Sequence, residues 1–181
     1  MKTLIVVDMQ NDFVTGSLGT KEAQAIVPNV KRKIQEYVDR GDQIIFTRDT
    51  HYSNYLGTQE GKMLPVIHCI QNSIGWQIED EIHELIKRLF VHPVYIDKES
   101  FGYNGWYLLQ DVLGSCEEIE LIGVCSDICV ISNALILKSQ FPEIKITVDA
   151  SCCAGVTPEL HKAALKVMRS CQINVIGDEE E

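Results

Sequence analysis

The strongest constraint on the fold is the alternation of short apolar runs with segments of helical periodicity along the chain. Short β-branched runs that end in polar residues predict buried strands, and apolar residues recurring every three or four positions predict helices. The expected strands are 3–7, 43–47, 93–96, 119–124, 145–149 and 173–176. The expected helices cover 26–38, 78–89, 105–113, 128–138 and 160–171. This alternation is typical of a parallel sheet with helices on both faces, so we expect a three-layer α/β/α fold.

The length and net charge of the chain limit the number of domains and the classes of partner that we expect. A chain of 181 residues is long enough for one domain and too short for two, so we expect a single domain over 1–181. The 45% apolar and 23% charged residues are those of an ordinary globular protein. A net charge of −10 argues against nucleic acid or an anionic membrane as partner, because phosphates and headgroups would repel it. We expect a small-molecule partner and assembly into a homo-oligomer.

The cysteines and the first residues indicate the cellular compartment in which we expect the protein. Seven cysteines, an odd number, are scattered along the chain, and we interpret them as reduced thiols. The opening "MKTLIVVD" meets an acid at Asp8, so we do not expect a signal peptide, and no apolar run is long enough to span a bilayer. These features predict a cytoplasmic protein.

Polar residues collect where the predicted strands end. In open parallel sheets, ligands bind beyond the carboxyl ends of the strands. The residues that follow the first four strands are Asp8, Asp49 with His51, Lys98, and Cys125 with Cys129. Each alone is more often structural, as a capping acid, a solvated lysine or a buried thiol. Their coincidence at one edge favours a functional site.

The segment "GVCSDICV" (123–130) holds two of the cysteines. Cys129 falls in the first turn of the next predicted helix, with Ser126 or Asp127 as N-cap. Free N–H groups at a helix start stabilise a thiolate, so this position favours a reactive sulfur of low pKa. Cys125 lies before the predicted helix and is stabilised less by its free N–H groups. Burial of both as small apolar residues remains the alternative at this point.

The irregular stretch 48–74 is long for a compact domain, and such loops are usually functional. It carries Asp49, His51 and His68, with Glu60 between the histidines. Carboxylate and imidazole ligands suit Zn²⁺, Fe or Mn rather than Ca²⁺. Unpaired surface histidines are the alternative to a metal site.

Several motifs, in order along the chain, carry a resemblance to a known family. They are "VVDMQNDF" (6–13), "RDTH" (48–51), "LPVIHC" (64–69), "DKESFG" (97–102) and "GVCSDICV" (123–130). They resemble the signatures of the isochorismatase-like cysteine hydrolases, and the metal motif resembles the nicotinamidase/pyrazinamidase branch. The resemblance implies a six-stranded parallel sheet with the first and fourth strands adjacent. It also implies a catalytic triad of Asp8, Lys98 and Cys129, with Cys125 where the family has a small residue.

The same resemblance implies one divalent metal ion, with Zn expected first and Fe or Mn as alternatives. Its ligands would be Asp49, His51 and His68, and Glu60 is the candidate for a fourth. The usual family motif "DWHPxxH" is replaced by "DTHYSNY" here, which changes the pocket wall.

The resemblance further implies a substrate pocket. Backbone N–H groups of Cys125 and Cys129 would form the oxyanion hole, next to a cis peptide at Val124–Cys125. The nearest apolar candidates for the wall of a ring pocket are Phe13, Leu18, Tyr103 and Trp106.

The implied activity is hydrolysis of nicotinamide to nicotinate and ammonia through a thioester. Asp8 would take the proton of Cys129, and Lys98 would stabilise the resulting charges. One alternative is a related hydrolase acting on a carbamoyl or ureido compound, and another is a vinyl-ether hydrolase, which needs no thiol at 129. A third, of a different class, is a non-catalytic zinc and thiol redox sensor, which leaves Asp8 and Lys98 unexplained.

Overall fold

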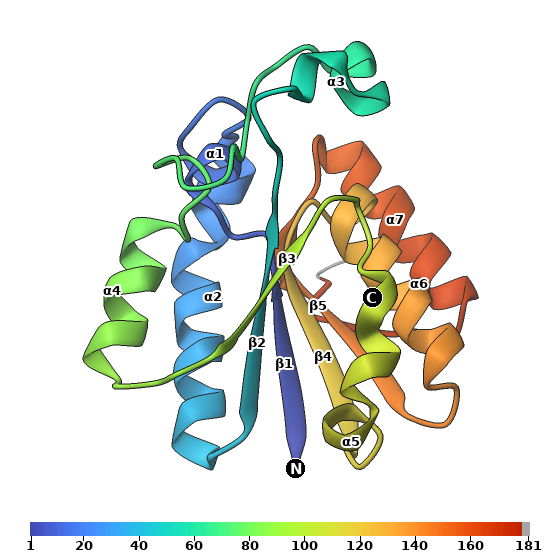
Figure 1. Cartoon of the computed structure of the whole chain (residues 1–181). Coiled ribbons are helices and arrows are strands. Elements are labelled where there is room, and N and C mark those ends of the chain that lie inside the picture. Colours follow the sequence, from blue (N-terminus) through green and yellow to red (C-terminus); the bar gives the residue numbers. More distant parts are fainter. Residues whose placement is uncertain (179–181) are drawn as a thin grey trace.

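A six-stranded parallel sheet forms the centre of the computed structural model (Figure 1). Its strands are β1 (Lys2–Val7), β2 (Gln43–Asp49), β3 (Val94–Lys98), β4 (Glu118–Val124), β5 (Lys145–Ala154) and β6 (Asn174–Ile176). Their order is β3-β2-β1-β4-β5-β6, and every neighbouring pair is parallel. The expected parallel sheet, with the first and fourth strands adjacent, is therefore confirmed. The structure describes residues 1–178, so the last three residues of the domain expected over 1–181 lie outside it.

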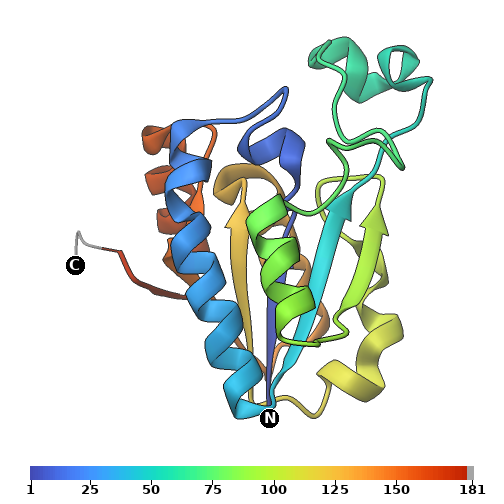
Figure 2. The same ribbon diagram turned by 90° about the vertical axis from the view of Figure 1, so that its left-hand side faces the viewer.

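Helices cover both faces of the sheet. On one face lie α2 (Lys21–Arg40) and α4 (Asp80–Arg88), in front of the strands in Figure 2. On the other lie η2 (Asn104–Leu109), α5 (Gln110–Leu113), α6 (Ile131–Gln140) and α7 (Pro158–Ser170). Alternate residues of β1 point into two separate cores, Leu4 into the first and Ile5 into the second. This explains why β1 is apolar nearly throughout rather than alternating.

The remaining elements are short and lie near the carboxyl ends of the strands. They are α1 (Asn11–Val14), η1 (Tyr55–Gly57), α3 (Gln59–Met63) and the π-helical turn η3 (Ser126–Val130). The predicted helix 128–138 is thus divided into η3 and α6. The loop expected at 48–74 contains η1 and α3, which stand beyond the strand ends (Figure 1).

Strand β5 continues to Ala154, beyond its predicted end at 149. The polar residues in this stretch satisfy each other: the N–H and hydroxyl of Ser151 donate to Asp149 Oδ1 at 3.0 and 2.6 Å. A polar pair of this kind does not interrupt the strand, although it interrupts the apolar run from which the strand was predicted.

The two central strands approach each other closely at the site edge. Gly123 in β4 has a φ of 117°, and a Cβ there would lie 2.1 Å from the carbonyl oxygen of Val7. Only glycine permits this approach. Asp8 follows with a φ of 50°, a left-handed conformation that aspartate tolerates better than most residues. Among residues 1–178, no helix has both the length and the apolar character that crossing a bilayer requires.

Candidate functional site

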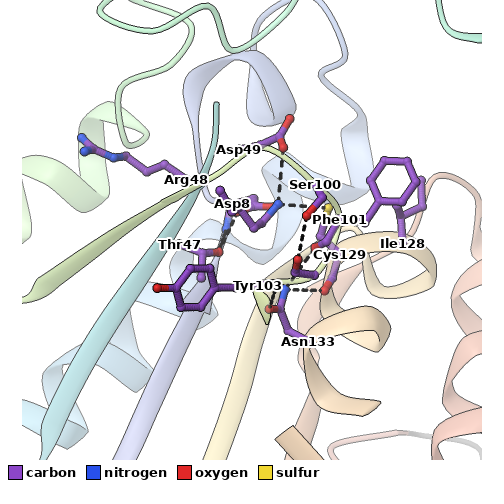
Figure 3. Close-up of polar contacts among 12 residues, drawn as sticks. Asp8, Thr47, Arg48, Asp49, Ser100, Phe101, Tyr103, Ile128, Cys129 and Asn133 are labelled. Atoms are coloured by element: carbon purple, nitrogen blue, oxygen red, sulfur yellow. Dashed lines mark hydrogen bonds and ion pairs between the residues drawn. The ribbon is translucent and has the colours of Figure 1, made fainter. Parts of the chain in front are cut away.

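The residues predicted to meet at the sheet edge do so. Asp8 directly follows β1, Asp49 and Lys98 are the last residues of β2 and β3, and Cys129 lies in η3 after β4. These four strands are neighbours in the sheet, so their carboxyl ends bring the side chains together (Figure 3). Asp8, Lys98 and Cys129 are 0%, 2% and 6% exposed. A carboxylate, an ammonium and a thiol therefore share one water-poor site.

Lys98 is the centre of this group. Its Nζ lies 2.6 Å from Asp8 Oδ2, donates to Cys129 Sγ at 3.7 Å and lies 3.4 Å from Asp49 Oδ1. Thr47 Oγ1 donates to Asp8 Oδ1 at 2.6 Å. Apart from the Lys98 ion pair, no group among residues 1–178 hydrogen-bonds to Asp8 Oδ2. That oxygen retains the capacity to accept a thiol proton.

Burial sets the direction of the pKa shift for Asp8 and Cys129, and neighbouring charges set it for Lys98. It raises the pKa of Asp8, and the opposing charge of Lys98 does not cancel the effect. Burial also raises the pKa of Cys129 well above its ordinary value, although Lys98 acts to lower it. The pKa of Lys98 is raised because the charges of Asp8, Cys129 and Asp49 outweigh the effect of burial. Asp8 is thus a stronger base than an exposed aspartate.

The prediction of a low-pKa thiol at a capped helix start is wrong for this turn. Cys129 is buried in a π-helical turn for which Cys125, not Ser126 or Asp127, is the N-cap residue, without a side-chain cap. Ser126 Oγ instead contacts His161 Nδ1 at 2.8 Å, and Asp127 accepts from the N–H of Val156 at 2.9 Å. The charged groups that act on the thiol are therefore Lys98 and Asp8, and the turn offers no capped helix start.

Asn133 in α6 is a site residue that the sequence analysis missed. Its Oδ1 accepts from the N–H of Tyr103 at 2.9 Å and from Trp106 Nε1 at 3.0 Å. Its Nδ2 donates to the carbonyls of Cys129 at 2.8 Å and Phe101 at 3.2 Å. The amide thus joins the segment after β3 to the turn that carries the thiol (Figure 3). An amide in an apolar, buried helix was the available signal, because buried amides need partners.

The four candidate metal ligands also converge. Asp49, His51, Glu60 and His68 each offer one ligand atom, and these atoms all lie within 4.8 Å of one another. His51 Nε2 lies 2.9 Å from Asp49 Oδ2 and 3.5 Å from Glu60 Oε1. His68 Nε2 lies 3.6 Å from Asp49 Oδ2, while its Nδ1 is 2.8 Å from the carbonyl of Val66. A contact of this kind at one ring nitrogen orients a metal-binding histidine.

The donor set fits a small divalent cation. Two imidazoles and two carboxylates are ligands that Zn²⁺ accepts. His51 Nε2 is buried and has no hydrogen-bond partner of normal geometry among the described residues. Burial lowers the pKa of His51, but contacts with Asp49 and Glu60 outweigh this and raise the pKa to about 9. The group therefore attracts positive charge, as a cation site requires.

A cavity of about 300 Å³ connects the thiol with the candidate ligands. Its lining residues are Phe13, Leu18, Thr20, Asp49, Glu60, Leu64, His68, Phe101, Cys125, Ile128, Cys129 and Val156. The predicted pocket residues Phe13 and Leu18 are among them, and the ring of Phe13 lies 5.6 Å from that of His68. Cys125 contributes to the wall. Phe101, Leu64 and Val156 were not predicted, because they lie on loops whose paths the apolar periodicity does not define. Ile128 was expected only as part of the buried helix 128–138, and the structure places it in the turn η3.

Tyr103 and Trp106, also expected at this cavity, are not among its lining residues. Trp106 is fully buried in the core under α6, where its indole N–H reaches Asn133. Tyr103 packs edge-on against it, with ring centroids 5.2 Å apart. The wall position after Lys98 is taken by Phe101 instead.

The expected cis peptide is present at Val124–Cys125. The carbonyl of Cys125 accepts the N–H groups of Ile128 and Val130 at 3.1 and 3.0 Å, which closes the turn around Cys129. The oxyanion role of the Cys125 and Cys129 N–H groups stays a prediction.

Comparison with known proteins adds to this geometry. A nicotinamidase of Saccharomyces cerevisiae is 25% identical over 215 residues, covering 97% of this chain and 99% of the yeast protein. A nicotinamidase of Escherichia coli is 29% identical over 180 residues, covering 86% of this chain and 84% of that protein. The crystal structure of a Pyrococcus horikoshii pyrazinamidase in complex with zinc has a TM-score of 0.80 and 26% identity, covering 98% of this chain and 99% of that one. The isochorismatase domain family matches residues 2–180, and the chain therefore belongs to this family.

Proposed function

We propose that this chain is a nicotinamidase, an amidohydrolase that converts nicotinamide to nicotinate and ammonia. The observation that carries the proposal is that Cys129, with its Asp8 and Lys98 partners, faces the same cavity as the candidate metal ligands. The names of the yeast and Escherichia coli relatives support the substrate, and the zinc-bound pyrazinamidase supports a divalent cation.

The chain's own residues account for the proton and charge transfers. Asp8 takes the proton of Cys129, whose sulfur attacks the carboxamide carbon. Lys98 lies between the two groups and offsets the negative charge that develops. The C–N bond breaks as Asp8 returns the proton to the departing ammonia, which leaves a thioester on Cys129. Asp8 then takes a proton from water, whose oxygen attacks the thioester carbon. The C–S bond breaks as Asp8 returns the proton to the sulfur of Cys129, and nicotinic acid leaves and loses its carboxyl proton to solvent as nicotinate.

The candidate ligands Asp49, His51, Glu60 and His68 would hold the divalent ion. Bound there, the ion would supply a Lewis acid for the pyridine nitrogen of the substrate. Phe13 and Leu18 give this part of the cavity an apolar wall that suits a flat ring.

Release of ammonia from nicotinamide, benzamide and a carbamoyl compound, with and without a chelator, tests the proposal. We expect kcat/KM for nicotinamide to exceed that for benzamide by on the order of 10–10³, because benzamide lacks the ring nitrogen. Chelation, or His68→Ala, should remove metal and raise KM for nicotinamide.

Comparable kcat/KM for the two aromatic amides would contradict the role of the ring nitrogen. A clear preference for the carbamoyl compound would favour the alternative hydrolase. Metal binding without ammonia release from any of the three would favour a non-catalytic protein.

A further inference from the structure

The motif "VVDMQNDF" contains three consecutive polar residues, Gln10, Asn11 and Asp12, to which the reaction assigns no role. They follow β1 and pair with the far end of the loop that carries the candidate ligands. The N–H groups of Asn11 and Asp12 donate to the carbonyls of Gln77 and Gly75 at 2.9 and 3.0 Å. The side chains of Gln10 and Asp12 contact the backbone at or beside candidate ligands, whereas the side chain of Asn11 contacts the loop elsewhere.

Gln10 holds Asp49 at both of its backbone groups. Gln10 is 0% exposed, and its Oε1 accepts the N–H of Asp49 at 2.7 Å. Its Nε2 donates to the carbonyls of Asp49 and Trp76, both at 2.9 Å. Because one buried amide bonds to both backbone groups of Asp49, the backbone from which this carboxylate extends is held in place without an ion.

Asp12 holds the backbone near both histidines. Its Oδ2 accepts the N–H of Cys69, the residue after His68, at 2.7 Å. The carbonyl of Cys69 in turn accepts the N–H of His51 at 2.9 Å. One carboxylate is therefore linked, through a single residue, to the backbone of both imidazole ligands.

The Asp12 carboxylate occupies a space that depends on a glycine. A Cβ on Gly75 would lie 2.0 Å from Asp12 Oδ2 and 2.4 Å from Oδ1. Any larger residue at 75 would displace the carboxylate from Cys69. A change at Gly75 therefore perturbs the contact without removing Asp12.

We propose that Gln10 and Asp12 are positioning residues for the metal centre, which fix Asp49, His51 and His68 at binding distance and thereby set the affinity for a divalent ion. The inference rests on the metal site of the proposed function. Asn11 provides a matched control: its Nδ2 donates to the carbonyl of Ile74 at 3.1 Å and to Asp80 Oδ1 at 3.4 Å. It secures the same loop at a point that does not contact the ligands.

The test is the Zn²⁺ affinity of the purified full-length protein, measured by competition with a chelating indicator. Gln10→Glu keeps an acceptor for Asp49 N–H but turns a carboxylate oxygen toward two carbonyls. Gln10→Glu and Asp12→Ala should each weaken Zn²⁺ binding about 10–100-fold, the usual cost of losing a partner that orients a metal ligand. Gly75→Ala should weaken it in the same direction, and Asn11→Ala should bind as the unmodified protein does.

Urea unfolding of each variant separates a loss of affinity from a loss of fold. If Asp12→Ala does not fold, Gln10→Glu and Gly75→Ala still decide the question. If these variants fold and bind Zn²⁺ as tightly as the unmodified protein while His68→Ala does not bind, the positioning role is wrong and the metal site stands. Equal weakening in Asn11→Ala would also overturn the inference, as general loosening of the loop. Undiminished binding by His68→Ala would overturn both the site and the inference.

Discussion

Replacement of Lys98 by methionine removes the positive charge at the centre of the site and keeps most of the side-chain length. The ammonium lies 2.6 Å from Asp8 Oδ2 and 3.4 Å from Asp49 Oδ1, and all three side chains are buried. Removal of one partner of a buried ion pair costs about 3–5 kcal/mol, because the other charge is left without compensation. We therefore expect Lys98→Met to lower the free energy of unfolding by about that amount and to abolish ammonia release.

The cost should fall mainly on Asp8. Asp49 keeps the imidazoles of His51 and His68 at 2.9 and 3.6 Å, whereas the groups left beside Asp8, the hydroxyl of Thr47 and the thiol of Cys129, carry no positive charge. Adding Asp8→Asn to Lys98→Met removes the orphaned charge. The double variant should recover most of the lost stability and remain inactive.

Urea unfolding followed by circular dichroism measures these differences, with Asp8→Asn alone as the control. The reasoning fails if Lys98→Met unfolds at the same urea concentration as the unmodified protein. It also fails if the losses of the two single variants simply add in the double variant, because independent sites show no coupling.

Four further substitutions have expected outcomes. Cys129→Ala should abolish ammonia release while metal binding persists, whereas Cys125→Ala should keep much of the activity, since burial raises the pKa of Cys125 to about 12 and its side chain lines the cavity without a part in the proposed chemistry. Burial raises the pKa of Glu118, but hydrogen bonds from Lys2 and Thr147 outweigh this and lower it to about 2. Glu118 therefore contributes stability above about pH 4.5 that is lost as the pH falls toward 2, and Glu118→Gln should show a shallower decline in acid unfolding curves. Asn133→Leu should lower kcat and raise KM for nicotinamide, because the turn that carries Cys129 and Phe101 in the cavity wall each lose a hydrogen bond; unchanged values of both would contradict this.

The meeting of Asp8, Lys98 and Cys129 could be predicted from the sequence for a topological reason. Parallel strands share one carboxyl edge, so any residue placed directly after a strand lies at that edge whatever the path of the connecting helices. The prediction needed only the ends of the first four strands, which the apolar runs locate to within two residues. The candidate ligands in the loop at 48–74 were found differently, through residue type and resemblance, because no periodicity defines the path of that loop.

Residues beyond the strand ends were harder to place. Trp106 is as apolar as a pocket residue should be, and it lies near Lys98 in sequence, yet it is in the core. What decides its position is the partner of its indole N–H, Asn133, which lies in a different helix. The proton affinity of Cys129 was predicted in the wrong direction for a similar reason. Helix position is visible in the sequence, whereas the burial that raises its pKa depends on every element packed around it.

Asp49 belongs to both halves of the site, and the strand order explains why. Its Oδ1 faces Lys98 at 3.4 Å, and its Oδ2 faces His51 at 2.9 Å. Strand β2 lies between β1 and β3, so its last residue lies near Asp8, which follows β1, and Lys98, which ends β3. The same residue begins the loop that carries both histidines. A cation held by the loop would draw on the charge of Asp49, which leaves more of the Lys98 charge for Asp8 and Cys129. The candidate ligands and the Cys129 thiol are therefore electrostatically connected through one carboxylate, and the buried amide of Gln10 is bonded to the backbone of that same residue.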